Sequence, residues 1–150
     1  LMNPLPEISM PQHCFTYGSL MCDDIMAAVA GLRAASVPAR LDGYRRSPVI
    51  GEQYPGMVPA ARDKVEGVLY LALPDTAWPR LDAFEGDEYR REQVSVECAD
   101  GRIESAWTYV FKPEYAARLA AGTWDFERFL STGKARFEAR YMGFDALDGT

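Results

Sequence analysis

Glu85 occupies the position in this sequence where a carboxyl group is best placed for acid–base chemistry. Leu81 and Phe84 precede it at helical spacing and Gly86 follows it, so the pattern predicts a short helix whose apolar face ends beside the glutamate. Apolar neighbours disfavour the charged form of a carboxyl group, which raises its pKa and lets it exchange protons near neutral pH. Glu85 is therefore the candidate general acid–base residue.

An exposed acidic cluster is the alternative interpretation of this segment. Asp87 and Glu88 are followed closely by Arg90 and Arg91, which could pair with them as ordinary surface ion pairs. Most charge clusters in proteins are of this solvated kind. The residues alone leave both interpretations open.

A second candidate is the segment made of Tyr17, Gly18, Ser19 and Leu20. The run over residues 14–17 is short, aromatic and β-favouring, which predicts a buried strand that stops at the glycine. Because glycine permits a close approach and the start of a helix exposes backbone N–H groups, this segment could bind a carboxylate or an oxyanion. A tight turn with a small-residue helix cap explains the same residues without any ligand.

Residues for other common chemistries are missing from the sequence. His13 is the only histidine, and Cys14 and Cys22 lack the close spacing of zinc ligands. The sequence has no G-x-S-x-G elbow of a serine hydrolase and no Walker-type or G-x-G-x-x-G phosphate loop. We therefore expect neither a metal nor an organic cofactor.

The composition is that of a globular chain, with 48% hydrophobic and 25% charged residues. The 16 lysines and arginines are interleaved with 22 acidic residues, and the net charge of −6 disfavours nucleic acid and anionic membranes as partners. The first residues lack the basic start of a signal peptide, and no apolar run reaches the length of a membrane span. Three cysteines are too few for a disulfide scaffold, so we expect a cytoplasmic protein with reduced thiols.

Hydrophobic periodicity predicts that strands fill most of the first two thirds of the chain. The expected strands cover residues 14–17, 36–44, 65–73, 89–98 and 103–111. Asp23 or Asp24 is expected to cap a helix after the first strand, and Asp75 or Thr76 to cap the short helix that carries Glu85.

The remaining segments are predicted from their composition. Residues 48–60 are rich in glycine and proline and are expected to form a loop with short extended pieces. The tail after Pro113 is predicted to be helical, with an apolar stripe that is interrupted at Gly133. The stripe contains Trp124, Phe126, Phe129, Leu130 and Phe137.

No repeat or linker divides the sequence, so we expect one domain. Residues 1–12 contain three prolines and are expected to form a loose lead-in, with a single domain over residues 13–150. Strands that follow one another with few crossover helices indicate the α+β class. The expected architecture is a small, closed or nearly closed β-barrel with helices at its rim.

Four segments taken together resemble the γ-glutamyl cyclotransferase superfamily, and most closely its avirulence-induced-gene-like branch. They are Phe15–Leu20, Gly51–Pro59 with its Tyr54-Pro55-Gly56, Val65–Tyr70, and Leu81–Gly86 followed by Tyr89-Arg90-Arg91. The segments follow the order of the family, and residues 124–130 also resemble the last helix of the plant members. Ser19 departs from the threonine of several members but keeps the hydroxyl group.

The resemblance implies a small β-barrel flanked by helices, with a cavity at one end. It implies that Tyr17–Leu20 lines this cavity and offers backbone N–H groups to substrate oxygens, that Glu85 is the acid–base residue, and that Tyr89 borders the cavity. The implied activity is release of 5-oxoproline from a γ-glutamyl amine or amide, without a cofactor. The implied partner is thus a small γ-glutamyl molecule.

Two other functions remain open at this stage. A non-catalytic or differently acting member could bind a small amino-acid-like ligand in the same cavity. An interaction module could instead use the aromatic stripe of the tail to contact another protein, although packing of that stripe on the barrel is the simpler interpretation.

Overall fold

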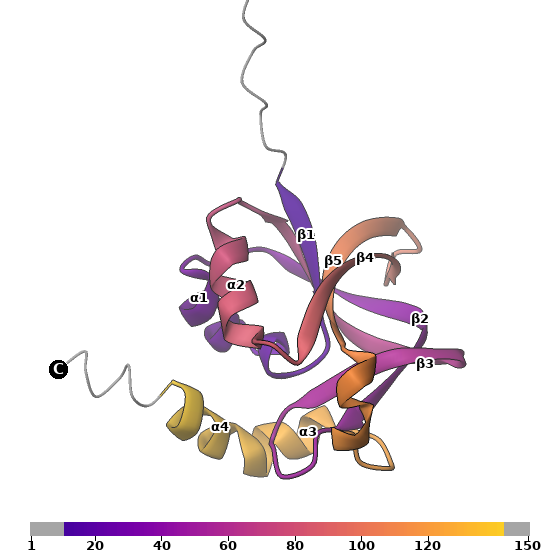
Figure 1. The fold of residues 1–150 in the computed structure, drawn as a ribbon. Helices are drawn as coiled ribbons and strands as arrows, with labels where there is room; N and C mark the ends of the chain where they lie inside the picture. Colours follow the sequence, from indigo (N-terminus) through magenta and orange to yellow (C-terminus); the bar gives the residue numbers. More distant parts are fainter. Residues whose placement is uncertain (1–10, 143–150) are drawn as a thin grey trace, which may run out of the picture.

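Five strands form a closed, mixed β-barrel in this computed structural model, which describes residues 11–142 (Figure 1). The strands are β1 (Gln12–Thr16), β2 (Ser36–Pro48), β3 (Pro55–Leu73), β4 (Tyr89–Cys98) and β5 (Ile103–Phe111). Their order is β1-β3-β2-β4-β5, and the barrel closes where β1 pairs in parallel with β5, all other pairs being antiparallel. The predicted α+β barrel is confirmed. Most of the expected lead-in, residues 1–10, lies outside the described residues.

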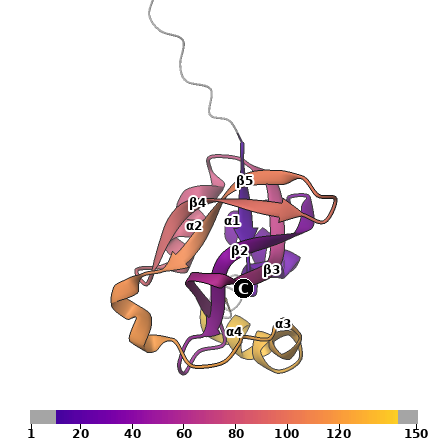
Figure 2. The ribbon, with the colours of Figure 1, turned by 90° about the vertical axis from the view of Figure 1, so that its right-hand side faces the viewer.

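Helices cover one side and one end of the barrel. They are α1 (Asp23–Ala30), α2 (Ala77–Glu85), α3 (Phe126–Arg128) and α4 (Lys134–Tyr141), with the 3-10 turns η1 (Ser19–Met21) and η2 (Pro113–Arg118) and the π-helical turn η3 (Phe129–Gly133). In Figure 1, α1 and α2 lie together beside β1, and α3 and α4 pass below the barrel. Figure 2 shows α3 and α4 at this same end.

The alternating pattern of β5 sorts its side chains into two buried clusters. Ala106 and Val110 pack inside the barrel, whereas Tyr109 and Phe111 pack with the apolar residues of the helices. Thr108 also alternates inward and is fully buried, and its hydroxyl group donates a hydrogen bond to the carbonyl oxygen of Phe15 on β1 (2.9 Å). The barrel and the helices therefore share β5 as a common wall.

The prediction of a loop with short extended pieces over residues 48–60 is right for residues 49–54 and wrong for residues 55–60, which belong to a long strand. β2 continues to Pro48 and β3 begins at Pro55, so the two strands form a long hairpin with a short connection. The prolines are tolerated because Pro48 and Pro55 face each other at the hairpin end, and Pro59 pairs with Tyr44 beside a shift in register. The backbone N–H groups that these prolines lack therefore fall at positions where the hydrogen-bonded pairing of β2 and β3 ends or is irregular.

The expected helix caps are wrong in part: Thr76 stands at the N-cap position of α2 as predicted, whereas Cys22, and not Asp23 or Asp24, stands at that of α1. α1 begins after Cys22, and neither Cys22 nor Thr76 before α2 caps its helix with a side-chain hydrogen bond. Asp23 and Asp24 lie in the first turn of α1 instead, where negative charge favours the positive end of a helix. Asp24 accepts a hydrogen bond from the backbone N–H of Ile25 (3.0 Å).

The predicted helical tail is confirmed only in part. Residues 113–118 and 126–141 are helical, residues 119–125 are not, and residues 143–150 lie outside the described residues. The helical periodicity also changes at a π-helical turn. Trp124, Phe129 and Phe137 are buried as predicted, whereas Leu130 is 42% exposed and does not belong to the apolar face. The π-helical turn ends at Gly133, where the stripe was expected to break. A π-helical turn inserts an extra residue and so rotates the following side chains, which a regular helical pattern does not anticipate.

Candidate functional site

One cavity between the barrel and the helices contains all six residues singled out in the sequence. They are Tyr17, Gly18, Ser19, Leu20, Glu85 and Tyr89. The other lining residues are mostly aromatic: Phe15, Tyr54, Phe84, Tyr109, Phe137 and Tyr141, with Thr16 and Pro55. The volume of the cavity that the centre of a water molecule can occupy is about 80 Å³. This is room for several water molecules or a small ligand.

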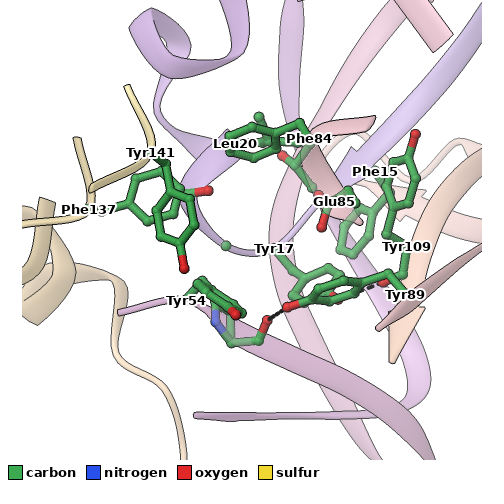
Figure 3. A pocket seen from close by; sticks show the side chains of 14 residues that line it. Phe15, Tyr17, Leu20, Tyr54, Phe84, Glu85, Tyr89, Tyr109, Phe137 and Tyr141 are labelled. Atoms are coloured by element: carbon green, nitrogen blue, oxygen red, sulfur yellow. Dashed lines mark hydrogen bonds between the residues drawn. The ribbon is translucent and has the colours of Figure 1, made fainter. Parts of the chain in front are cut away.

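Glu85 is the last residue of α2, and its carboxyl group points into this cavity (Figure 3). Gly86 ends the helix with a φ of 81°, a left-handed conformation that favours glycine. The side chain therefore leaves the helix at the point where the chain turns toward β4. This placement agrees with the sequence prediction, whereas the proton-transfer role of Glu85 stays a prediction.

The surroundings of Glu85 favour its protonated form. Although the residue as a whole keeps some exposure, burial of the carboxyl group raises its pKa from the ordinary value of 4.5 to about 8, and the negative charge of Asp82 adds to the shift. No hydrogen bond from another described residue holds the Glu85 carboxyl oxygens. The Glu85 carboxyl group can therefore gain or lose a proton near neutral pH, and its oxygens are free to contact a ligand.

Asp82 lies one turn before Glu85 on α2, and two side chains hold its carboxylate in place. Arg91 Nε lies 3.1 Å from Asp82 Oδ1, and the hydroxyl group of Tyr109 donates a hydrogen bond to Oδ1 (2.7 Å). The Arg91 guanidinium lies over the rings of Trp78 and Trp107, 5.0 Å from each centroid. Arg91 therefore does not form the pair with Asp87 or Glu88 that the surface interpretation requires.

The glycine turn lies against the β2–β3 hairpin end. A Cβ atom at Gly18 would lie 2.9 Å from Pro55 Cδ, so this close approach requires glycine. Arg46 Nη1 donates a hydrogen bond to the carbonyl oxygen of Tyr17 (2.9 Å) and holds the peptide before the turn. Within residues 11–142, no hydrogen bond is donated by the backbone N–H groups of Gly18, Ser19 or Leu20, which leaves three donors beside the cavity.

Two buried tyrosines shape the wall rather than offer free donors. Tyr17 donates its hydroxyl hydrogen to the carbonyl oxygen of Tyr109 (2.5 Å), and Tyr89 donates to that of Pro55 (2.7 Å). Burial is the main cause that raises the pKa of both phenols well above the usual range, so both stay neutral. Their expected contribution to substrate binding is therefore one of shape and apolar contact.

Several lining residues were missed in the sequence. From the sequence, Tyr54 belongs only to a segment that resembles the family, and Tyr109 lies only within the strand expected over residues 103–111. Phe137 and Tyr141 are four residues apart on α4, a spacing that places them on one helical face. Extending the aromatic stripe to Tyr141 was possible from the sequence, but no local pattern indicates that α4 reaches a cavity beside α2.

Other kinds of site find little support in the described part of the chain. No group of three or more His, Cys, Asp or Glu side chains among residues 11–142 could hold a metal ion. Cys14, Cys22 and Cys98 are buried and unpaired, and burial is the main cause that raises the pKa of each thiol. None of the helices within this range is long and apolar enough to span a bilayer.

The buried carboxyl group makes the stability of the protein pH-dependent. Below about pH 4.5 the carboxyl group is protonated in both folded and unfolded chains, whereas between 4.5 and 8 only the folded chain keeps the proton. The free energy of unfolding should therefore fall as the pH rises through this window, by up to about 1.4 kcal/mol per pH unit. Urea titrations of the wild type and Glu85→Gln at pH 4.5 and 8.5 measure the effect. An equal loss in both proteins would contradict a buried, protonated Glu85.

Comparison with known proteins identifies the relatives of this chain. A family profile described as "Gamma-glutamyl cyclotransferase, AIG2-like" matches residues 14–126. AIG2-like protein D of Arabidopsis thaliana is 37% identical over 117 residues, which cover 77% of this chain and 76% of that protein.

Solved structures share the fold. The solution structure of an Arabidopsis thaliana protein has a TM-score of 0.70 at 24% identity and covers 96% of this chain and 97% of its own. A structure of a γ-glutamyl cyclotransferase has a TM-score of 0.60 at 19% identity and covers 67% of this chain and 66% of its own. Identities this low support the fold, and the profile and the curated relative support the family. The chain therefore belongs to the AIG2-like family of γ-glutamyl cyclotransferases.

Proposed function

We propose that this protein releases 5-oxoproline from a γ-glutamyl amine or amide. The observation that carries the proposal is the position of Glu85. Its carboxyl group has a pKa of about 8 and lies in the same cavity as three backbone N–H groups that have no hydrogen-bond partner among residues 11–142. Membership of the family makes the γ-glutamyl group the substrate class to test first.

In the proposed reaction the substrate supplies its own nucleophile. The α-amine attacks the γ-carbonyl carbon, a C–N bond forms, and the original amide C–N bond breaks to release the amine. Glu85 accepts the proton that the α-amine loses and returns it to the leaving nitrogen, so no proton is gained or lost overall. Because attack is intramolecular, the cavity mainly has to hold the folded conformer of the substrate.

The pKa of Glu85 suits this transfer. An α-amino group ordinarily has a pKa of about 7.7–8.0, close to the value of about 8 for Glu85. Proton exchange between the two groups is then nearly balanced in free energy, the condition under which one group can act as base and then as acid. An exposed glutamate would be too weak a base for the first step.

The glycine turn supplies the remaining polar contacts in the proposal. The N–H groups of Gly18, Ser19 and Leu20 are suited to hold the α-carboxylate or the oxyanion that develops on the γ-carbonyl oxygen. Either contact fixes the substrate with its γ-carbonyl carbon near Glu85. No cofactor takes part in any step.

Measurement of 5-oxoproline release from a panel of γ-glutamyl compounds tests the proposal. The panel includes γ-glutamyl amino acids, glutathione and γ-glutamyl amines, each incubated with the wild-type protein at pH 8. Release from at least one compound supports the enzyme. If no compound is turned over but one binds in calorimetry, the ligand-binding alternative replaces it.

Removal of the charge behind Glu85 should move the pH profile. Asp82 raises the pKa of Glu85, so Asp82→Asn lowers that pKa and shifts the acid limb of the kcat profile to lower pH. Asparagine can still accept the hydrogen bond from Tyr109. Asp87→Asn is the matched control, because the exposed Asp87 is not among the causes of the Glu85 shift. If the acid limb of the kcat profile stays at the wild-type pH in both variants, Glu85 is not the titrating base.

A further inference from the structure

Arg91 joins the helix that carries Glu85 to two strands of the barrel. Arg91 of β4 and Tyr109 of β5 are directly paired across the sheet, so their side chains lie on the same face. Both side chains reach Asp82 of α2, which lies three residues before Glu85. One carboxylate therefore connects α2, β4 and β5 within a single helical turn of Glu85.

The Arg91 guanidinium is held in a defined orientation. Its Nε lies 3.1 Å from Asp82 Oδ1 and its Nη2 lies 3.2 Å from Oδ2, so each carboxylate oxygen faces a guanidinium nitrogen. The rings of Trp78 and Trp107 also contact the guanidinium, as described above, and the Arg91 side chain is only 31% exposed. Arg91 would lose all three contacts if it turned away into solvent.

Asp82 is the charged side chain that acts on Glu85. After burial, its negative charge is the remaining cause that raises the pKa of the Glu85 carboxyl group. Asp87, Arg91 and Lys112 line an outer groove that also touches Glu85, but none of them is a cause of this shift. Arg91 can therefore affect Glu85 mainly by compensating the charge of Asp82.

The other titratable groups around the Glu85 carboxyl group are neutral. They are phenols and a thiol from β1, the glycine turn, the β2–β3 connection, β4, β5 and α4. Burial is the main cause that raises the pKa of each, so none carries a charge near pH 7: Cys14, Tyr17, Tyr54, Tyr89, Tyr109 and Tyr141. The pair formed by Asp82 and Arg91 is thus the charged neighbour that matters.

Tyr109 holds Asp82 independently of Arg91. Its hydroxyl group donates the hydrogen bond to Asp82 Oδ1 (2.7 Å), and its side chain lines the cavity near Glu85 (Figure 3). Its carbonyl oxygen accepts the hydrogen bond from Tyr17 (2.5 Å), which fixes the backbone as well. Loss of the Arg91 charge therefore leaves the Asp82 carboxylate near Glu85, where it opposes a second negative charge more strongly.

We infer that Arg91 is a positioning residue for the proposed reaction, because it offsets the negative charge that Asp82 places beside Glu85. The two tryptophan rings hold the guanidinium in the orientation that this requires. The inference rests on the proposed function. It gives a role in the reaction to an ion pair outside the cavity, since neither Arg91 nor Asp82 is a lining residue.

Two variants of Arg91 separate its charge from its packing. Arg91→Gln keeps a hydrogen-bond donor for Asp82 but removes the cation, so the acid limb of the kcat profile should move to higher pH by about 0.5 units or more. Below the limb, kcat should then fall by about threefold or more. Arg91→Lys keeps the cation and should leave the limb at the wild-type pH, although lysine cannot contact both carboxylate oxygens as arginine does. A limb that stays in place in Arg91→Gln, or moves equally in both variants, would overturn the inference.

A double variant tests whether Arg91 acts through Asp82. In the Asp82→Asn background, Arg91→Gln should move the limb by less than about 0.2 units, because no charge remains to be compensated. A shift as large as in the wild-type background would overturn the inference. Arg90→Gln is the matched control: Arg90 is the preceding residue of β4, is 63% exposed and pairs with Glu92, so the limb should stay in place. An equal shift in Arg90→Gln would mean a general effect of net charge and would also overturn it.

A titration without substrate separates failure of this inference from failure of the proposed function. Carbon-13 NMR of the Glu85 carboxyl carbon, assigned by loss of its signal in Glu85→Gln, gives the titration midpoint in each protein. If no γ-glutamyl compound releases 5-oxoproline, the proposed function fails, and the midpoints then test the effect of Arg91 on Glu85 alone. A higher midpoint in Arg91→Gln than in the wild type and Arg91→Lys supports charge compensation. Equal midpoints in the three proteins overturn it.

Discussion

Replacement of Glu85 by glutamine is expected to lower kcat for 5-oxoproline release by roughly 10²–10⁴-fold, the usual contribution of a general acid–base residue. Glutamine keeps the shape of the side chain but cannot exchange the proton between the α-amine and the leaving nitrogen. The Michaelis constant should change far less than kcat, because the proposed polar contacts of the γ-glutamyl part are those with the glycine turn. Steady-state kinetics with 5-oxoproline quantified by chromatography measures both constants.

Glu114→Gln provides the matched control for this variant. Glu114 is exposed at the start of η2 and is not a lining residue, so the same chemical change there should leave kcat unaltered. The Glu85→Gln protein should remain folded and should resist alkaline unfolding better than the wild type, because it no longer buries a charge. A folded Glu85→Gln protein with wild-type kcat would remove Glu85 from the mechanism.

Replacement of Gly67 by alanine is expected to have the largest effect on folding. A Cβ atom there would lie 2.2 Å from the carbonyl oxygen of Thr16 and 2.7 Å from the ring of Phe15. β1 would have to move away from β3, and Thr16 would lose the hydrogen bond that its hydroxyl group donates to Val68 (2.8 Å). We expect a loss of about 3 kcal/mol or more in unfolding free energy. Thermal unfolding should then occur roughly 6–12 °C lower.

Gly101→Ala separates steric overlap from the general effect of losing a glycine. Gly101 has a φ of 90° in the β4–β5 turn, and no atom lies within 4 Å of a Cβ built there. Its replacement should cost only about 1–2 kcal/mol, from backbone strain. Denaturant titrations followed by circular dichroism compare the two variants. A smaller loss for Gly67→Ala than for Gly101→Ala would mean that β1 and β3 do not approach as closely as described.

The parts of the fold that were predicted correctly are those fixed by local pattern. β4 and β5 have the predicted bounds because their side chains alternate and because Asp100-Gly101 matches a hairpin turn, with Gly101 at positive φ. The start of β3 was missed because proline usually indicates a loop. Whether proline fits a strand depends on its partner across the ladder, such as Pro48 opposite Pro55, and that pairing is a tertiary property.

The site was predictable to a similar extent. Glu85 and the glycine turn stand out because each lies at the end of one element, and the resemblance to a family joined them. The aromatic part of the cavity wall was not foreseen, because the rings of Tyr54, Phe84, Phe137 and Tyr141 come from the β2–β3 connection, α2 and α4, which are far apart in the sequence. Their meeting depends on the π-helical turn η3 just before α4, where the regular helical period does not apply.

β1 and β5 pair in parallel at Cys14 and Trp107, so formation of the site depends on closure of the barrel. This pairing holds the glycine turn next to Tyr109, so the hollow is complete only when the first strand, the middle of the chain and the last helix have all come together. A compound that fills the hollow therefore binds the native state alone, and by mass action it must raise the midpoint of a melting curve. Ligands can thus be sought by calorimetric melting of the intact chain, before any reaction is known.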